Sequence, residues 1–344
     1  MKKRALCLFL AATLLLLPAC GADAPQSENS EPKGKVYYSF FDTVSYVYSY
    51  ANDSAERFDD LSADCAHILG EYHKLCDIYH EYEGVNNLCT LNKQAGKEPV
   101  ELSPELIEFL KEAKELYAST NGEMNVMMGS VLSLWHNARE AGDYVPTDEE
   151  LSEAAQHTDI DLLVIDGNTA FITDEKASID VGAFAKGYAT EKAAQHLISE
   201  KADGYVLNIG GNIRVIGTKP DGSGWKTGIK DPFDSANSIA AKVSISDISC
   251  VTSGIYERFF TVDGQRYHHI IDKDTLYPSE HFASVTVLVR DSGIADALST
   301  ALFCMSEEEG AKIAEAFGAE ILWIYPDGTK SMTPGMGEYI EETA

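Results

Sequence analysis

The sequence predicts an α+β fold: a single large domain with antiparallel or mixed sheets and packed helices. Segments with helical spacing of apolar residues and segments rich in β-branched and aromatic residues both occur along the chain, without the regular alternation of βαβ units. Hydrophobic residues make up 44% of the 344 residues, enough for a sizeable core. No linker-like composition interrupts residues 36–344, which we therefore expect to form one folded domain.

Residues 1–19 are predicted to be a lipoprotein signal peptide. Three basic residues precede an apolar run, Ala5–Leu17, that is too short to span a membrane comfortably. The run ends in Leu17-Pro18-Ala19-Cys20, which resembles a bacterial lipobox. This predicts lipidation at Cys20, palmitate included, and a protein anchored on the extracytoplasmic face of the cell membrane. The alternative is an ordinary signal peptide with an incidental cysteine.

Residues 20–35 are small, polar and proline-containing, which is typical of a flexible tether behind the lipidated cysteine. Loss of residues 1–19 takes away three basic groups and no acid, so the formal charge moves from −28 to −31. So acidic a body argues against binding nucleic acid or anionic lipid headgroups. A phosphate-containing substrate would need a metal cation to offset the repulsion.

Helices are predicted wherever apolar residues recur at helical spacing. The first runs from Phe58 to Tyr79. Ser103-Pro104 supplies the N-cap and N1 proline of the next, and Thr147-Asp-Glu-Glu150 fits a capping box. The remaining helices are expected after Asp180, over Ile294–Met305 and over Glu307–Phe317.

Strands are predicted from dense β-branched and aromatic residues, beginning with Val36–Tyr50. Asp263-Gly264 between two such runs predicts a hairpin. The other expected strands are Leu162–Asp166, Ala170–Thr173, Tyr205–Asn208, Ile213–Thr218, Trp225–Ile229, Ile239–Ile245, Arg258–Val262, Tyr267–Ile271, Ser284–Val289 and Ile321–Tyr325.

The cysteines indicate neither a disulfide framework nor a zinc site. Outside the signal and the lipobox their number is odd, their spacing is irregular and no C-x-x-C occurs. Cys65 and Cys76 lie on the apolar stripe of the first predicted helix, which favours buried free thiols.

Two glycine-containing segments are candidates for chemistry. In Ile179–Ala194, the small residues between Asp180 and Gly187 would let a ligand or another backbone approach closely. The alternative is an acid at a helix N-terminus and a solvent lysine. The glycines of Asn208–Asn212 can turn N–H groups toward a phosphate, although a plain turn explains them equally well.

Two further segments carry polar side chains that are candidates for catalysis or ligand binding. His268 and His269 are adjacent in a predicted strand, so we expect at most one to face a site, as a general base or ligand contact. Asp296 and Thr300 are four residues apart on a predicted helix and offer two hard oxygens to Mg²⁺. The alternative is an aspartate near the helix start and a threonine bonding back to a carbonyl.

Taken together and in this order, these motifs resemble the ApbE-type FAD:protein FMN transferases. The resemblance spans the chain from about residue 36, which implies an ApbE-like, T-fold-like architecture. The motifs that carry it are Phe41-Asp42-Thr43, Asp180-x-x-x-x-x-Lys186-Gly187-Tyr188, Gly210-Gly211-Asn212, Thr252-Ser253-Gly254-x-Tyr256-Glu257-Arg258, His269-Ile270-Ile271-Asp272 and Ala295-Asp296-Ala297-x-Ser299-Thr300.

The resemblance implies a Mg²⁺-dependent enzyme that moves FMN from FAD, its substrate, to a threonine or serine hydroxyl of a partner flavoprotein and releases AMP. The implied acceptor is a membrane redox subunit or an exported flavoprotein. The implied metal ligands are the carbonyl of Ala183 and the side chains of Asp296 and Thr300. His269 and Asp180 are the implied catalytic residues, His269 assisting the attacking hydroxyl. The implied FAD-binding residues are Phe41, Tyr82, Glu123, Met124, Asn125, Asp180, Lys186 and Ile271.

The sequence departs from the family pattern at three places. Asn125 stands where an aspartate is common, Ser299 stands where some members offer another metal-ligating aspartate, and Asp272–Pro278 lacks the proline and glycine of D-P-x-T-G-x-P. We expect a weaker second metal site and altered partner recognition. Two other functions remain open: a Mg²⁺-dependent FAD pyrophosphatase, with water as acceptor, and a non-catalytic flavin-binding lipoprotein.

Overall fold

The computed structural model describes residues 32–234 and 238–341. The predicted signal peptide, Cys20 and most of the tether lie outside the described residues. Within these ranges, no helix is both long enough and apolar enough to cross a bilayer. Pro32–Ala344 forms one compact unit.

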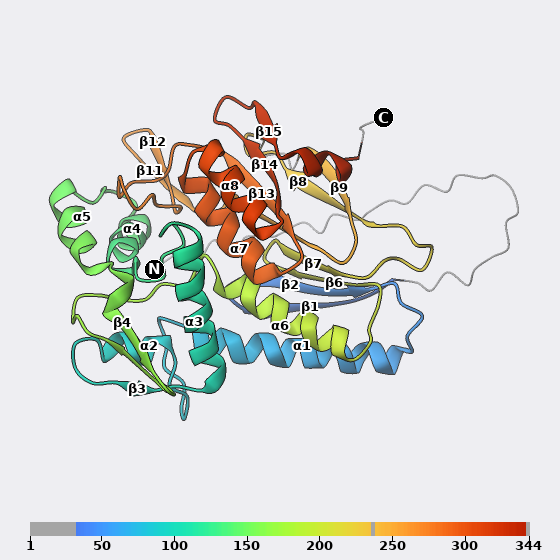
Figure 1. Ribbon diagram of the computed structural model, residues 1–344, viewed down its shortest axis with the longest axis horizontal. Coiled ribbons are helices and arrows are strands. Elements are labelled where there is room, and N and C mark those ends of the chain that lie inside the picture. The colour runs from blue at the N-terminus through green and yellow to red at the C-terminus, as the bar shows by residue number, and fades with distance from the viewer. Residues whose placement is uncertain (1–31, 235–237, 342–344) are drawn as a thin grey trace, which may run out of the picture. The chain divides into compact units, whose positions relative to one another are not determined.

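An eight-stranded antiparallel sheet, in the order β1-β2-β6-β7-β10-β13-β14-β15, organises the structure (Figure 1). Strands from both ends of the chain therefore lie in one sheet. The strands are β1 (Lys33–Phe40), β2 (Thr43–Ser49), β6 (Tyr205–Ile209), β7 (Asn212–Ile216), β10 (Ser249–Gly254), β13 (Ser284–Val289), β14 (Glu320–Ile324) and β15 (Lys330–Met332).

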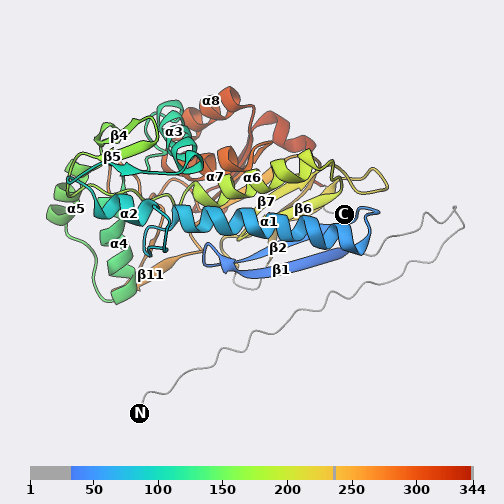
Figure 2. The ribbon, with the colours of Figure 1, turned by 90° about the horizontal axis from the view of Figure 1, so that it is seen from below.

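Helices cover one face of this sheet. Helices α1 and α6 run side by side beneath strands β1, β2 and β6, and α7 packs on α6, β10 and β13 (Figures 1 and 2). The main hydrophobic core fills this layer, with side chains such as Leu69, Phe184 and Leu298 fully buried. The helices are α1 (Ala55–Cys76), α6 (Ala185–Ser199), α7 (Ser292–Ala301) and α8 (Glu307–Phe317).

The opposite face is covered in part by the hairpin of β8 (Trp225–Lys230) and β9 (Ile239–Ile245), which adds a second core around Val215 and Val243. A third, smaller cluster centres on Trp135, where α4 (Gly129–Ala141) and α5 (Asp148–Ala154) meet the separate hairpin of β11 (Phe259–Val262) and β12 (Gln265–His268). The peripheral elements are α2 (Leu88–Lys93), α3 (Pro104–Ser119), β3 (Val100–Glu101), β4 (Leu163–Asp166) and β5 (Thr169–Ile172), with short 3₁₀ turns at Ala155–His157, Ile160–Leu162, Leu302–Cys304 and Pro334–Glu338.

The local signals for helix starts and the hairpin are confirmed. The Ser103 side chain accepts the Leu106 N–H at the start of α3, and both bonds of the Thr147–Glu150 capping box form. Asp263 and Gly264 have φ of 50° and 82°, the left-handed pair that a tight hairpin between β11 and β12 requires.

The segment Val36–Tyr50 is two strands rather than one. Phe41 and Asp42 adopt φ of 51° and 53°, which reverses the chain in a two-residue turn between Phe40 and Thr43. Asparagine and glycine are the usual residues in such turns, so nothing in Phe-Asp indicated it. The turn places Phe41 at the cavity described below, which is consistent with backbone strain retained at a functional position.

The first helix ends at Cys76, three residues before its predicted end. Asp77 leaves the helical conformation, and its carboxylate accepts the N–H groups of Tyr79 and His80. An aspartate that bonds the backbone two and three residues on competes with helix continuation. Asp77 also accepts the hydroxyl proton of Tyr82 at 2.8 Å, so the turn that ends α1 positions the Tyr82 ring.

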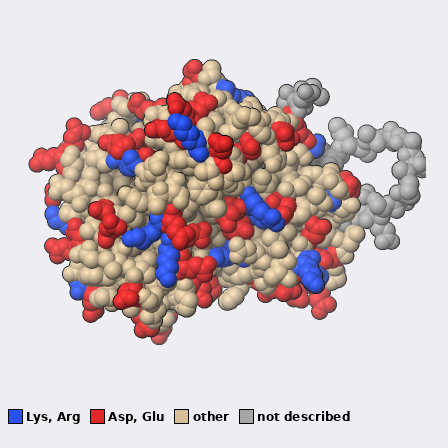
Figure 3. Space-filling model, in the orientation of Figure 1, with Lys and Arg blue, Asp and Glu red and all other residues tan. Residues whose placement is uncertain are grey.

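Acidic side chains are spread over the face of the molecule seen in Figure 3, with fewer lysines and arginines among them. This agrees with the formal charge of −28 for the whole chain. The five cysteines in the described residues, Cys65, Cys76, Cys89, Cys250 and Cys304, are all free and buried, as predicted for Cys65 and Cys76.

Candidate active site

One large cavity, of about 1090 Å³, receives residues from distant parts of the chain. Its volume lies just above the usual range of small-molecule sites, roughly 300–1,000 Å³. All twelve site residues predicted for the folded domain line it: Phe41, Tyr82, Glu123, Met124, Asn125, Asp180, Ala183, Lys186, His269, Ile271, Asp296 and Thr300. Glycines Gly210 and Gly211 of the β6–β7 turn also line it.

The start of α6 brings three predicted residues beside α7. The Gly187 N–H donates to Asp296 Oδ2 at 2.8 Å, and Lys186 Nζ lies 3.5 Å from the same oxygen. A Cβ on Gly187 would collide with the Ser292 carbonyl and the Asp296 side chain. The close packing of the α7 backbone therefore requires glycine at position 187. The other small residues of this segment, Gly182, Ala183 and Ala185, line the cavity.

The carbonyl of Ala183 lies just before α6, whose N-cap is Phe184. Gly187 is the third residue of this helix, so its N–H has no acceptor within the helix, and Asp296 supplies one. No donor among the described residues reaches the Ala183 carbonyl oxygen. Ala183, with this free carbonyl oxygen, thus lines the same cavity as the buried Asp296 carboxylate. These are the oxygen ligands that Mg²⁺ prefers, so the residues fit the predicted metal.

Thr300 completes the predicted ligand set from the next turn of α7. Asp296 is 4% exposed, and Thr300 is partly exposed to the cavity. Within residues 32–234 and 238–341, no cluster of three or more histidine, cysteine, aspartate or glutamate side chains is placed to hold a metal. The predicted set differs from such clusters because it has a single carboxylate, with a hydroxyl and a main-chain carbonyl.

Asp180 lies at the turn into α6. Its Oδ1 accepts the Gly182 N–H at 2.9 Å. Burial raises the pKa of Asp180, while this hydrogen bond and the positive charge of Arg258 oppose the rise. A cavity-facing carboxyl group with a raised pKa is typical of a functional position.

His269 is exposed to the cavity, and its Nδ1 lies 3.2 Å from the Arg258 carbonyl oxygen. Because a carbonyl oxygen only accepts, Nδ1 carries the proton and Nε2 keeps a free lone pair. The enclosing cavity wall, and next the positive charge of Arg258, lower the pKa of His269. At neutral pH the ring is therefore uncharged and able to accept a proton.

The expectation that only one of the adjacent histidines faces the site is wrong, because both line the cavity. Strand β12 ends at His268, so strand alternation does not extend to His269. His268 Nε2 contacts the Ser279 carbonyl at 2.9 Å, which anchors that ring to the protein.

Glu123 and Asn125 line the cavity through a loop that other segments hold in place. Lys273 Nζ lies 3.1 Å from Glu123 Oε1, and burial raises the pKa of Glu123 to about 7 against the effect of Lys273. Asn125 Nδ2 donates to the Thr158 carbonyl, and Asn125 Oδ1 accepts the Met127 N–H. An aspartate could not make the first of these bonds, which explains Asn125 at this position.

Several cavity-lining residues were given no role from the sequence. Ser253 and Arg258 belong to the motif at residues 252–258, which pointed to the region without indicating their functions. His136 and Arg139 come from α4, a helix that the sequence did not predict, so no sequence signal could have found them.

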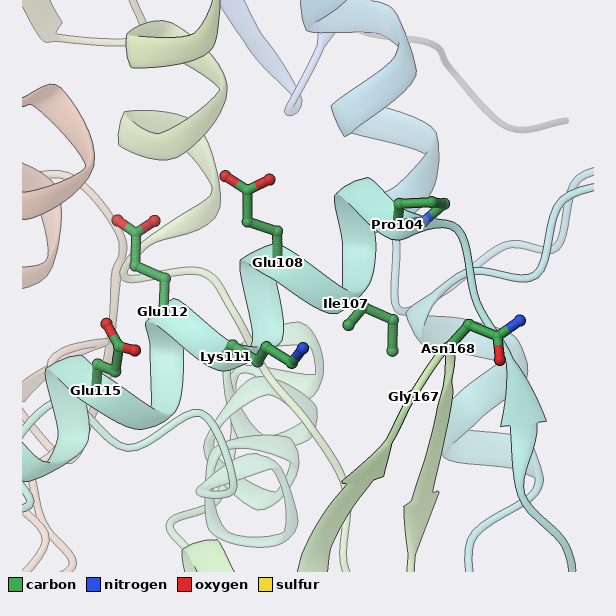
Figure 4. Close-up of a pocket in the computed structure, with 8 residues that line it drawn as sticks. All are labelled: Pro104, Ile107, Glu108, Lys111, Glu112, Glu115, Gly167 and Asn168. Atoms are coloured by element: carbon green, nitrogen blue, oxygen red, sulfur yellow. The ribbon is translucent and has the colours of Figure 1, made fainter.

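A second cavity, of about 490 Å³, lies along α3 and contains none of the predicted site residues. Figure 4 shows Glu108, Glu112 and Glu115 extending from the helix beside it. Burial, and next the charge of Asp291, raise the pKa of Glu112 to about 7. Lys192 Nζ lies 2.7 Å from Glu108 Oε1, so part of this acidic charge is already paired. We assign no chemistry to this depression.

Comparisons with known proteins agree with the fold. The ApbE family model matches residues 42–323. A Vibrio cholerae serotype O1 protein named FAD:protein FMN transferase is 33% identical over 315 residues, which cover 91% of each chain. The crystal structure of the ApbE protein from Thermotoga maritima has a TM-score of 0.79 at 27% identity, covering 91% of this chain and 100% of that one.

The solved flavin transferase ApbE from Vibrio cholerae has a TM-score of 0.77 at 29% identity, covering 90% of this chain and 99% of that one. These likenesses confirm the predicted α+β architecture. With the family model matching most of its length, the chain belongs to the ApbE family.

Proposed function

We propose that this protein is a Mg²⁺-dependent FAD:protein FMN transferase that acts on a threonine or serine hydroxyl of a partner flavoprotein. The observation that carries the proposal is the meeting of Asp296, Thr300 and the free Ala183 carbonyl in a cavity that also contains His269. The names of the relatives support the substrate, FAD, and the transferred group.

In the proposed reaction the acceptor hydroxyl oxygen attacks the phosphorus of the FMN half of FAD. The new bond joins this oxygen to phosphorus, and the bond to the bridging oxygen of the pyrophosphate breaks, so AMP leaves with the electron pair. Bound Mg²⁺ would neutralise the pyrophosphate charge, which is the main requirement of phosphoryl transfer. Ala183, Asp296 and Thr300 would hold it.

His269 is suited to accept the proton of the acceptor hydroxyl. Its Nδ1–H is held by the Arg258 carbonyl, so Nε2 is the accepting atom. Lys186 is suited to contact the phosphates, because its ammonium group lies at the cavity wall beside Asp296. The Tyr82 ring, fixed through Asp77, offers a surface for stacking.

Lipidation at Cys20 is proposed from the lipobox and would keep the enzyme on the extracytoplasmic face of the membrane. A membrane redox subunit or an exported flavoprotein at the same face is then the acceptor. Cys20→Ala should release the protein from the membrane fraction or leave it unprocessed. Wild-type protein recovered soluble, cleaved after residue 19 and without lipid would contradict the anchor.

The reaction type is tested with a flavoprotein subunit that carries FMN on threonine when mature, purified without flavin. With FAD and Mg²⁺, mass spectrometry should show one added FMN per acceptor and an equal amount of AMP. Asp296→Ala should abolish both products, whereas Glu112→Gln at the second cavity should not. Rapid release of AMP and free FMN with an unmodified acceptor would establish the pyrophosphatase instead. Flavin binding without any AMP would indicate the binding protein.

A further inference from the structure

Three hydroxyl groups form a chain between β10 and α7 at the cavity wall. Ser253 Oγ lies 2.8 Å from Ser299 Oγ and 3.4 Å from Thr300 Oγ1. Ser299 Oγ lies 2.9 Å from the Asp296 carbonyl oxygen, one helical turn earlier. Ser253 and Thr300 line the cavity, whereas Ser299 is fully buried and does not.

The proton of each hydroxyl can be assigned because each has only one. The Asp296 carbonyl cannot donate, so Ser299 donates to it. Ser299 then has no proton left for Ser253, so Ser253 donates to Ser299. The remaining contact can only be a donation from Thr300 to Ser253, which is long and therefore weak but has a fixed direction.

We infer that Ser253 and Ser299 are positioning residues that turn the lone pairs of Thr300 into the cavity for a cation. A hydroxyl that binds a cation uses an oxygen lone pair and directs its proton elsewhere. The chain supplies that other direction, because Ser253 accepts the Thr300 proton. The inference rests on the proposed function, in which Thr300 is a Mg²⁺ ligand, and adds the residues that orient it.

The same chain gives Ser299 a role different from the one expected. A weaker second metal site was expected from the missing aspartate at this position. The Ser299 hydroxyl instead points between α7 and β10, where it links the Asp296 carbonyl to Ser253. Its effect on a cation would thus be transmitted through Thr300 rather than by direct contact.

The test measures cation affinity rather than catalysis. Mn²⁺ serves as a paramagnetic probe for Mg²⁺, titrated into the full chain with and without FAD, and free Mn²⁺ is followed by electron paramagnetic resonance. Ser253→Ala should weaken Mn²⁺ binding roughly 10-fold, as loss of residues behind a ligand commonly does. Ser253→Thr keeps the hydroxyl and should retain the affinity. Thr300→Val supplies the effect of losing the ligand itself.

Ser299→Ala is the more decisive test of the hydroxyl chain, because it removes a buried group that cannot touch the cation. Ser253, freed of its acceptor, would then donate to Thr300, and the Thr300 proton would turn into the cavity. We expect a similar loss of Mn²⁺ affinity with an unchanged melting temperature. The matched control is Ser284→Ala: this serine is fully buried on β13 opposite Gly254, and its hydroxyl has no hydrogen-bond partner among the described residues.

The outcomes separate this inference from the proposed function. If wild type binds Mn²⁺ and Thr300→Val weakens it, but both serine variants bind normally, the hydroxyl chain is refuted and the metal proposal stands. If wild type binds no Mn²⁺ with FAD present, the metal proposal fails and the inference fails with it. Equal losses in Ser284→Ala and Ser299→Ala would also refute the chain, because they would indicate a general packing effect.

Discussion

The main-chain N–H of Gly187 donates to Asp296 Oδ2 at 2.8 Å, joining the first turn of α6 to the middle of α7. This bond orients the Asp296 carboxylate and gives an acceptor to one of the N–H groups that the start of α6 leaves without a helical partner. The relationship depends on the absence of a side chain at Gly187, because the α7 backbone occupies the place of a Cβ.

Gly187→Ala should therefore destabilise the protein by several kcal/mol and weaken Mg²⁺-dependent FAD binding. The added methyl group would push α6 and α7 apart, and overpacking of this kind costs roughly 1–3 kcal/mol before the hydrogen bond is lost. Thermal unfolding and calorimetry with and without a chelator are the measurements.

The matched control is Gly70→Ala, another helical glycine, at which a Cβ would lie 3.4 Å from the Phe40 ring. Because alanine is favoured over glycine inside a helix by roughly 1 kcal/mol, this variant should be neutral or more stable. Equal melting temperatures for the two variants would contradict the packing argument.

His269→Gln should lower the rate of FMN transfer by roughly 10²–10⁴-fold, the usual contribution of a general base. The lowered pKa of His269 means that wild type should show no loss of activity near the ordinary histidine value as the pH falls from 8 to 6. The measurements are initial rates of AMP release over this range. His67→Gln, at an exposed position of α1, is the control and should behave as wild type. The prediction would be contradicted if the wild-type rate fell as the pH dropped from 8 to 6 and this fall were absent in His269→Gln. The His269 ring would then become charged just below neutrality.

The Glu123 carboxyl should make stability fall as the pH rises from 5 to 8. Its pKa is about 7 in the folded chain against an ordinary 4.5, so the folded state binds more protons than the unfolded state in this window. The stabilisation is complete at pH values below the pKa of Glu123 in the unfolded chain. It is lost as the pH rises through the pKa of Glu123 in the folded chain. Glu123→Gln should thus gain stability over wild type with rising pH, by about 2 kcal/mol at pH 8.

Lys273 opposes this pKa rise through its 3.1 Å contact with Glu123. Lys273→Met should therefore extend the loss of stability to higher pH, whereas Lys273→Arg should keep the wild-type profile. Denaturant unfolding at half-unit pH steps measures both. Parallel curves for the methionine and arginine variants would show that the ion pair has no effect on Glu123.

Substitutions at Leu276 should reverse the usual order of stability, in which an alanine variant is more stable than a glycine variant. It stands where D-P-x-T-G-x-P has glycine and adopts φ of 63°, which costs a residue with a side chain roughly 1–2 kcal/mol. Both Leu276→Ala and Leu276→Gly lose the packing of this side chain near Trp135, but only glycine is relieved of the strain. The glycine variant should be the more stable by about 1 kcal/mol in denaturant unfolding.

Leu134 supplies the comparison, since it packs on the same cluster from helix α4 and does not line the large cavity. There the alanine variant should be more stable than the glycine variant, as in any helix interior. If the alanine and glycine variants had the same order of stability at Leu276 as at Leu134, the backbone strain assigned to Leu276 would be refuted.

The sequence predicted those parts of the fold that local chemistry decides. Helix starts at Ser103 and Thr147 and the Asp263-Gly264 hairpin depend on neighbouring residues alone, and all three form. Helix α4 was not predicted because its N-cap position is Met128, which makes no side-chain cap. Strand β10 was not predicted either, because Ser249–Gly254 has no aromatic residue and few β-branched ones, and its pairing with β7 and β13 joins segments far apart in the sequence.

The site was predicted as a set of residues rather than as an arrangement. Family motifs identified residues that the fold brings to one cavity, including Phe41 and Thr300 from opposite ends of the chain. The motifs did not reveal that glycine is needed at position 187 for close packing against α7 rather than for ligand binding. They also did not reveal that Ser253 contacts Thr300. Such contacts join elements far apart in the sequence, and no local pattern records them.

The cavity wall formed by β11 and β12 pairs with no other strand in the described ranges and packs through its own small cluster around Trp135. A segment attached mainly by side chains can open without unfolding the sheet behind it. Its amide protons should accordingly exchange with solvent much sooner than those of β10 and β13. For the transferase proposed above, such an opening would give the acceptor hydroxyl access to the cavity, and reclosure would exclude water from the reacting phosphate.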